Sequence, residues 1–482
     1  MTLAALMAPP PETAAEDLFA WADAGQRELI AQIKRLVELL AADPGLAPAL
    51  GQTPGQGRRA LAGRGLELDA AQLSPLWRDG FNPWPKAHTP LLALWDRWLR
   101  SHAAHRARLR AIAGLPPALA AWRDRQMARC ALELGPFANR LDYPVLAFEL
   151  SKGCSIGCWF CALEAPRLSA VFRRDDRGAK LWRETLAACA EVLGPAALAN
   201  APCYWASEPA DNPDYPDLLA DLAALAGRPG PTTTAAATGD IGWTRALLAI
   251  YDGRPGLRFS VLSLEMLAAI HAAFSPLELL LVDCLAQNEA SAIPKSRSGR
   301  ARRGGRWLAA RQAAEARLAG RATDPRRETT ACLAGFKLNM AEQTIELLSP
   351  CAASDRWPRG YRLHAEGSFA TAEDVGRFIK QTAERLTPQS PPPGRAIGLG
   401  HGVVLRHNAH ALEFTSAAAK MRLPAEPALA RVAGLAAQGK WDAAALLDQA
   451  AAAGVGPLEA MAALEALFAR GLLDDDPPAG ER

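Results

Sequence analysis

The sequence predicts an α/β protein built around a series of six β/α units, with helices before the series and a small helical module after it. Three observations lead to this fold class. From residue 144, short apolar runs alternate with helical segments, which is typical of a parallel sheet or barrel. Before residue 140 the apolar residues recur at helical spacing, and residues 424–474 contain three short amphipathic helices. Six parallel units predict a partial (β/α)6 or closed TIM-like barrel.

Each expected element follows from a local pattern. In the N-terminal helical region, residues 1–140, the apolar spacing predicts a helix across 18–40 that Pro44 and Gly45 end, and a second helical run from residue 91. The strands expected in the core, residues 141–390, are Val145–Leu150, Tyr204–Ser207, Thr232–Thr238, Arg258–Leu262, Leu277–Val282 and Thr330–Leu333, with helices between them such as Lys180–Val192 and Leu218–Leu225.

Beyond the sixth unit, the pattern predicts a strand at Thr344–Leu348 and a helix at Ala372–Leu386. A proline-rich linker at 389–394 then leads into the C-terminal module, residues 391–482. Its three helices are expected at Pro427–Gln438, Trp441–Ala453 and Pro457–Gly471. The short helices and the final glycine are typical of a small helical or winged-helix-like module.

Composition excludes several functional classes. Hydrophobic residues make up 50% and charged residues 22% of the 482 positions, which argues against disorder and against a coiled coil. There are 54 Lys and Arg against 51 Asp and Glu, so a net charge of +3 gives no overall attraction to nucleic acid or to acidic lipid. Neither a signal peptide nor a membrane span is evident. We therefore expect a cytoplasmic protein with no nucleic-acid or membrane partner.

Three of the nine cysteines, Cys154, Cys158 and Cys161, fall within eight residues directly after an expected strand. Cytosolic thiols stay reduced, so this spacing favours metal binding or catalysis over disulfides. Thiolates select iron–sulfur clusters, zinc or copper(I). A structural zinc site needs a fourth protein ligand, and no histidine lies between His105 and His271. Three cysteines would instead hold a [4Fe–4S] cluster and leave one iron open to an external ligand.

The C-x3-C-x2-C spacing, with the aromatic Phe160 before the last cysteine, resembles the motif of the radical S-adenosylmethionine (SAM) enzymes. The resemblance implies one [4Fe–4S] cluster whose open iron chelates SAM, and cleavage of SAM to methionine and a 5′-deoxyadenosyl radical. It also implies that Phe160 lies beside the cofactor and that an acidic motif follows the second strand. Here that motif is Ser207-Glu208, where the family usually has Gly-Gly-Glu. By the same resemblance, Ser260 on the fourth strand would face the SAM ribose.

Two segments narrow the resemblance to the radical SAM peptide epimerases. The first, from Lys152 to Cys161, reads KGCSIGCWFC, and the second, from Leu348 to Pro358, reads LSPCAASDRWP and is followed by Gly-Tyr. The likeness covers the chain from about residue 80 to residue 390. Such enzymes convert L- to D-residues in ribosomally made peptides. The resemblance therefore implies a ribosomal precursor peptide with a leader as substrate and a one-electron reductant as partner.

Epimerisation also needs a group that returns a hydrogen atom to the opposite face of the peptide Cα. A thiol with an ordinary pKa of about 8.5 is mostly protonated at neutral pH and can supply it. Cys351 stands among polar residues, between Ser349 and Arg356, which indicates an accessible functional loop. Cys284, after the fifth expected strand, is the alternative donor. The six cysteines outside the motif contain no close pair, so we expect one cluster only.

Two other functions stay open at this point. A peptide cross-linking or thioether-forming enzyme would use the same cofactors but change the mass of its product, whereas a non-catalytic peptide-binding relative would not cleave SAM. A further feature is the basic segment Lys295–Arg306, which carries six positive charges in twelve residues. We interpret it as a solvated loop, with contact to an acidic leader peptide as the functional alternative.

Overall fold

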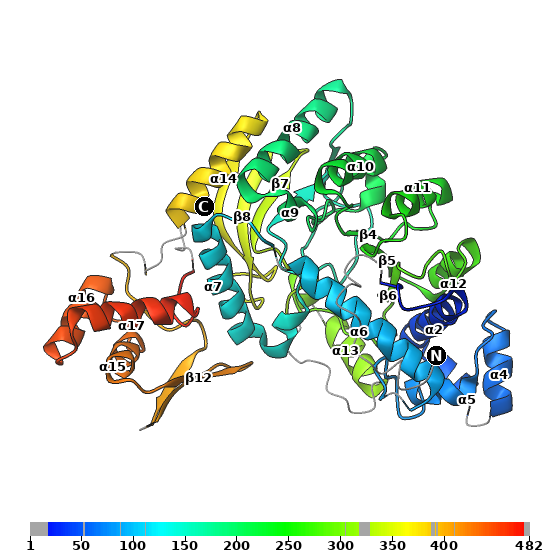
Figure 1. The fold of residues 1–482 in the computed structure, drawn as a ribbon, viewed down its shortest axis with the longest axis horizontal. Helices are drawn as coiled ribbons and strands as arrows, with labels where there is room; N and C mark the ends of the chain where they lie inside the picture. The colour runs from blue at the N-terminus through cyan, green and yellow to red at the C-terminus, as the bar shows by residue number, and fades with distance from the viewer. Residues whose placement is uncertain are drawn as a thin grey trace.

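The chain folds as a mixed α/β protein with small sheets and many covering helices (Figure 1). Among the helices described, none has both the length and the hydrophobicity needed to cross a bilayer. The residues described by this computed structural model are 18–51, 54–86, 88–110, 112–303, 305–317, 328–386, 391, 394–408 and 410–476.

Helices fill the N-terminal region. The helix expected across 18–40 is α2 (Ala24–Ala42), which starts at a capping box: Asp23 Oδ1 accepts from the Gln26 N–H, and Gln26 Oε1 accepts from the Asp23 N–H. Its apolar stripe is buried, as helical spacing requires. The helices that follow are α3 (Leu46–Leu50), α4 (Pro54–Ala62), α5 (Ala70–Leu73), α6 (Pro90–Arg110) and α7 (Pro117–Leu134).

Two small sheets carry the parallel strands. In the first, β1 (Leu146–Glu149) pairs in parallel with β7 (Gly335–Asn339). In the second, β5 (Leu257–Val261) lies between β4 (Thr232–Thr234) and β6 (Asp283–Ala286) and runs parallel to both. The helices of this region are α8 (Asp176–Leu193), α9 (Pro195–Leu198), α10 (Tyr215–Ala226), α11 (Ile241–Tyr251), α12 (Leu264–Ala273) and α13 (Arg306–Arg317).

Three of the six expected strands differ from the structure. Leu277–Val282 forms turns whose hydrogen bonds are local, as from the Val282 N–H to the Leu279 carbonyl, and β6 begins only at Asp283. A short apolar run buries its side chains equally well in a turn, so hydrophobicity alone misplaced this strand.

The other two errors have local causes. In Thr330–Leu333, the Ala331 N–H bonds to the Thr329 hydroxyl at 2.9 Å, and the ladder with β1 starts at Gly335. The segment Tyr204–Ser207 makes a single bridge to β1 and then turns through Ala206, whose φ is +49°. Side-chain and turn hydrogen bonds replace strand pairing at both places.

Antiparallel strands extend the first sheet. β8 (Thr344–Pro350) pairs with β7, and β9 (Tyr361–Ser368) pairs with β8, giving the order β1-β7-β8-β9. β8 contains the expected strand Thr344–Leu348, whereas the sequence pattern did not indicate β9. The expected helix Ala372–Leu386 is α14 with the same bounds, and it packs against α8.

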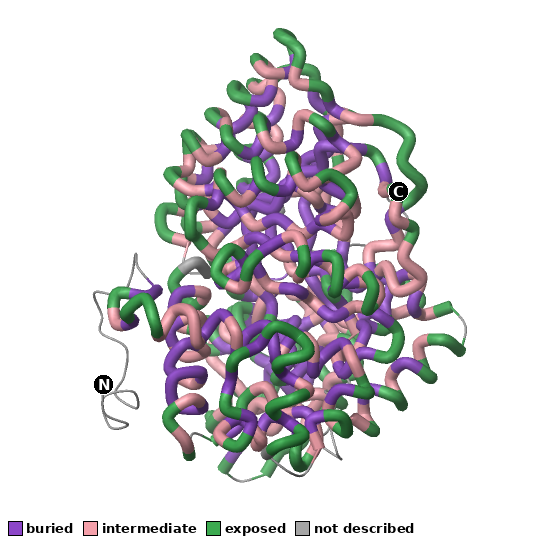
Figure 2. The backbone as a smooth tube through the Cα atoms, turned by 90° about the vertical axis from the view of Figure 1, so that its right-hand side faces the viewer, coloured by how far each residue is buried: buried purple, intermediate pink, exposed green. Residues whose placement is uncertain are grey.

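The C-terminal residues form a three-stranded antiparallel sheet and three helices, placed beside α7 at one end of the molecule (Figure 1). Leu132 of α7 joins their apolar core. A second core unites the N-terminal helices with the parallel strands. Figure 2 shows the buried backbone in the middle of the molecule and exposed segments around it. The C-terminal elements are β10 (Val404–His407), β11 (Ala411–Thr415), β12 (Lys420–Pro424), α15 (Pro427–Ala436), α16 (Ala443–Ala452) and α17 (Pro457–Ala469).

Three consecutive aspartates near the C-terminus, Asp474 to Asp476, form ion pairs with arginines of the core. Asp476 is 8% exposed and accepts from Arg129 at 2.5 Å, from the Trp357 indole at 3.0 Å, and from the buried Arg362. These contacts hold the pKa of the Asp476 carboxyl far below its ordinary value of 3.8, against the opposing effect of burial. The end of the chain is therefore fixed to the core by buried ion pairs.

We expect Asp476→Asn to lower the midpoint of thermal unfolding. The change removes one carboxylate from Arg129 and from Arg362, which keep Asp474 and Glu133 as partners, so the cost should lie below the about 3–5 kcal/mol of a buried charge left with no partner. Because the folded-state pKa is lowered, the stabilisation is complete above pH 3.8 and is lost as the pH falls below that value. Asp448→Asn, at an exposed position on α16, is the matched control. Equal midpoints for both variants would contradict the role assigned to Asp476.

Candidate functional site

A cavity of about 240 Å³ lies where the chain leaves β1, β4 and β5 at their carboxyl ends. Parallel strands bring their carboxyl ends to one edge, which is where α/β proteins bind ligands. The cavity collects all the cofactor residues that the sequence predicted. These lining residues are Cys154, Cys158, Phe160, Cys161, Ser207, Glu208 and Ser260.

The three motif cysteines lie on one loop, residues 153–169, which we call the cluster loop. Its ends are held together by a short antiparallel ladder between β2 (Ser151–Lys152) and β3 (Ala170–Val171). Gly153 has a φ of +86°, and a Cβ there would lie 2.4 Å from the Arg167 carbonyl oxygen, so only glycine fits. The loop is therefore closed at its base, and its cysteines face the cavity.

Burial has the largest effect on the two motif thiols whose pKa is shifted. Burial, together with the neighbouring Cys161 and Cys154, raises the pKa of Cys158 to about 11. Burial also raises the pKa of Cys154. A bound cationic centre would favour the thiolate forms of both.

Glu208 is fixed in the cavity wall. Its side chain is 4% exposed, and its carboxylate accepts from the Ala235 N–H at 2.8 Å, from the Ala210 N–H at 3.1 Å and from the Thr234 hydroxyl. Burial raises the pKa of Glu208, and the three hydrogen bonds oppose that effect. A carboxylate accepts about four hydrogen bonds, so one acceptor position is left for a ligand.

Two polar residues of the cavity lining, Tyr204 and Thr233, were missed, together with Arg258, which bonds to Tyr204. Tyr204 lines the cavity, and its phenol oxygen accepts from Thr233 Oγ1 at 2.9 Å and from Arg258 Nη2 at 2.6 Å. Arg258 and Ser260 alternate along β5 with buried apolar residues, so they share one face of the strand. That period of two was a usable signal, because Arg258 interrupts an otherwise apolar run.

Cys351 does not line this cavity and is not itself accessible, although the loop that follows it is exposed at Asp355 and Arg356. It follows β8, is 0% exposed, and donates its N–H to the Gly360 carbonyl at 3.0 Å. Ser349, which precedes it on β8, pairs inside the protein with His364 at 2.8 Å. The polar residues thus marked an exposed loop, but they did not show that the thiol beside it is buried. Burial raises the pKa of the Cys351 thiol, which keeps it protonated.

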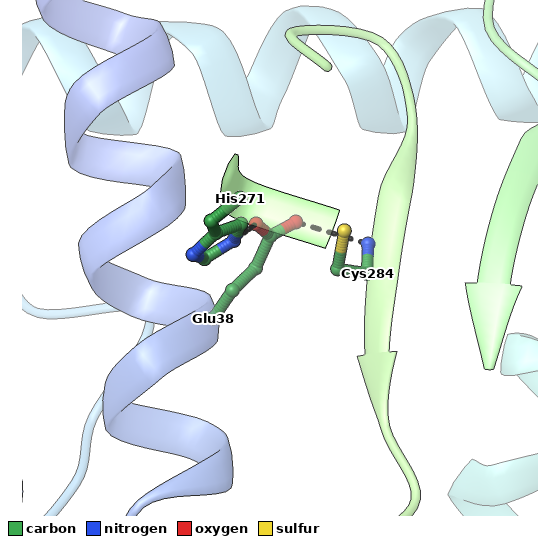
Figure 3. Close-up of side chains that lie close together, drawn as sticks. All are labelled: Glu38, His271 and Cys284. Atoms are coloured by element: carbon green, nitrogen blue, oxygen red, sulfur yellow. Dashed lines mark hydrogen bonds and ion pairs between the residues drawn. The ribbon is translucent and has the colours of Figure 1, made fainter. Parts of the chain in front are cut away.

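The alternative donor, Cys284, also lies away from the cavity. It is on β6 and points toward Glu38 of α2 and His271 of α12 (Figure 3). Such a trio is a type of metal-binding group, but Lys34 Nζ lies 2.5 Å from Glu38 Oε1 and donates to the Val282 carbonyl at the same distance. The carboxylate is already neutralised, so we interpret the group as a buried ion pair that joins α2 to β6.

The basic segment is not a solvated loop over residues 295–302. Lys295 is 6% exposed and donates to the Ser291 hydroxyl at 2.7 Å and to two carbonyls, and it lines the cavity above Phe160. Arg302 reaches in the other direction, to the Ala353 carbonyl at 2.9 Å. Charge density alone could not reveal these contacts, because Phe160 and Ala353 are distant in the sequence and the near partners of Lys295 are mostly backbone carbonyls.

Comparison with known proteins gives a relative of nearly the same length. The chain is 34% identical over 461 residues to "Uncharacterized protein y4wI" of Sinorhizobium fredii (strain NBRC 101917 / NGR234), and the alignment covers 94% of this chain and 88% of the relative. No protein-family model matches the chain, and no solved structure matches it. The name of the relative states no activity, so the function has to be argued from the cavity itself.

We expect Lys34→Met to destabilise the protein, because it leaves the Glu38 carboxylate buried without its cation. Loss of one partner of a buried pair costs about 3–5 kcal/mol, and thermal unfolding would measure it. The control is Lys180→Met, which removes an exposed pair with Glu184 and should change stability by less than about 1 kcal/mol. Zinc-dependent stabilisation of the wild type that Cys284→Ala abolishes would contradict the interpretation as an ion pair.

Proposed function

The chain belongs to the same family as the uncharacterized protein y4wI of Sinorhizobium fredii, and from the cavity of this chain we propose that the protein is a radical SAM enzyme that acts on a peptide. One observation carries the proposal. The three thiols of the C-x3-C-x2-C motif share a cavity with Ser207 and Glu208 from a second segment and with Ser260 from a third. Chance cysteines on a surface loop would not share a cavity with a buried carboxylate.

The residues present suit a [4Fe–4S] cluster with SAM. The three thiols line one cavity, and thiolates are the protein ligands of iron–sulfur clusters. When bound, the cluster and SAM supply a 5′-deoxyadenosyl radical. In this proposal Cys154, Cys158 and Cys161 hold the cluster. Glu208 accepts from the SAM amino group, while Ser207, Ser260 and Phe160 line the space for the rest of the cofactor.

We further propose that the strands form a partial (β/α)6 barrel. Backbone hydrogen bonds from the Phe148 N–H to the Pro202 carbonyl and from the Trp205 N–H to the Phe148 carbonyl place the Tyr204 segment beside β1. On the other side, Tyr204 bonds through its phenol to residues of β4 and β5. These contacts support the order β1, Tyr204 segment, β4, β5, β6, with the cavity at the carboxyl ends.

Epimerisation of a ribosomal precursor peptide is the reaction that we propose. With the radical that bound SAM would supply, a peptide Cα–H bond would be broken, and the Cys351 S–H bond would then break as a new Cα–H bond forms on the opposite face. The thiyl radical left on Cys351 would take one electron from a one-electron reductant, and a proton would restore the thiol. Burial supports this role because it keeps the thiol protonated. The segment at Thr329 and Gly360 separates Cys351 from the cavity, so the peptide has to displace part of that wall.

One observation favours a second candidate, a peptide cross-linking or thioether-forming enzyme. Every non-motif cysteine among the described residues is absent from the cavity lining. Cross-linking joins two substrate positions after hydrogen abstraction and needs no hydrogen atom from the protein. The two reactions differ in product mass, which is unchanged by epimerisation and reduced by cross-linking.

The cofactor proposal predicts about four irons per chain after anaerobic reconstitution. Cys158→Ala should lose most of the iron and all reductive cleavage of SAM to 5′-deoxyadenosine. Cys189→Ala changes a cysteine buried in α8, away from the cavity, and should retain both. Iron quantification and chromatography of the reaction make the measurement. Wild-type protein that binds no iron, or binds iron and cleaves no SAM, would contradict the proposed function.

The reaction proposal predicts deuterium incorporation. With the precursor peptide in deuterated water, each inverted residue should gain one deuteron, because the Cys351 thiol exchanges with solvent. Cys351→Ala should continue to cleave SAM but give no D-residue. Mass spectrometry and chiral analysis of the hydrolysed peptide report both. A product that has lost hydrogen mass would support the cross-linking candidate instead.

A further inference from the structure

The basic segment is packed against the cluster loop. Arg303 pairs with Glu164, and the Arg306 guanidinium lies 5.0 Å from the centre of the Trp159 ring. Both partners belong to the part of the loop that surrounds the last two cysteines. Side chains of the basic segment therefore contact the cluster loop, although those of Arg303 and Arg306 stay largely exposed.

Arg300 makes the most specific of these contacts. Its backbone N–H donates to the Cys161 carbonyl at 3.0 Å, its Nη1 donates to the Cys158 carbonyl at 3.3 Å, and its Nη2 donates to the Ala165 carbonyl. A Cβ on the preceding Gly299 would lie 2.5 Å from the Cys161 carbonyl oxygen, so the two backbones touch. One residue thus holds the carbonyls of two of the three motif cysteines.

We propose that Arg300 is a positioning residue for the cluster: its forked guanidinium fixes the curvature of the cluster loop between Cys158 and Ala165, so that the thiols of Cys158 and Cys161 are oriented before the cluster binds. The inference rests on the proposed function for the identity of the bound group. The geometry that it concerns belongs to the protein chain alone.

An arginine is required for this task. Its two terminal nitrogens are held in one plane and can donate to two separate carbonyls at once. A lysine in its place keeps the positive charge but offers one nitrogen, which cannot span the Cys158 and Ala165 carbonyls. Arg300→Lys therefore separates an effect of charge from an effect of shape.

The first test uses the protein without iron. Hydrogen–deuterium exchange of peptides covering 158–165 should be faster in Arg300→Ala and in Arg300→Lys than in the wild type. Arg297→Ala is the matched control, because it removes the same charge from the same segment at an exposed side chain that lies over Trp307 and not over the cluster loop. Its exchange should equal that of the wild type.

The second test uses the reconstituted protein. Release of iron to a chelator should be about tenfold faster or more in Arg300→Ala and Arg300→Lys, the size of effect that loss of a supporting contact has on a metal site. The electron paramagnetic resonance spectrum of the reduced cluster should broaden in both variants and stay unchanged in Arg297→Ala.

The outcomes separate the two proposals. If the wild type takes up no iron, the proposed function fails, and the exchange experiment still decides whether Arg300 orders the loop. If the wild type holds a cluster and Arg300→Ala matches it in exchange and in iron release, the inference about Arg300 is wrong while the proposed function stands. Full rescue by Arg300→Lys would also overturn it, since charge and not shape would then be responsible.

Discussion

Three thiols can face one point only if the loop that carries them is fixed at its ends and along its length, and the contacts around the cavity meet that requirement. The β2–β3 ladder closes the base of the cluster loop. The Ser155 N–H donates to Asp211, three residues after Glu208, at 2.9 Å. The basic segment holds the far side through Arg300. Without these restraints, the loop could adopt conformations in which the cysteines no longer face the cavity.

Buried charges organise the rest of the molecule in the same way. Lys34 with Glu38 joins α2 to β6, and Arg362 with Asp476 joins β9 to the end of the chain. Such pairs repay their desolvation only when each partner is held in place. They therefore fix the relative positions of the elements that they connect. Nonspecific apolar packing specifies such positions less well.

The sequence indicated the parts of the site that a single segment carries. Cys154, Cys158 and Cys161 were indicated by their spacing, and Glu208 by the family resemblance, although the segment before it is not a strand. The contacts of Arg300 could not be predicted, because its partners lie more than a hundred residues away and hydrogen bonds to backbone carbonyls leave no pattern in residue type. Lys295 bonds to residues close to it in the sequence, and charge patterning could not show that these bonds bury it in the cavity wall. The strand at 283–286 was missed for a related reason: it starts with an aspartate, and the apolar run before it is buried as turns.

The proposed epimerisation sets a condition on the position of Cys351. A hydrogen atom removed on one face has to be returned on the other, so the donor would have to lie across the peptide from SAM. The segment 328–330 lines two cavities: Thr330 lines the cavity of the motif thiols, while Glu328 lines a second cavity of about 650 Å³ together with Ala352, next to Cys351. A peptide that entered between the two cavities would have the motif thiols on one side and the buried thiol on the other. In the proposed reaction, burial would keep the thiol protonated and would exclude solvent from the radical.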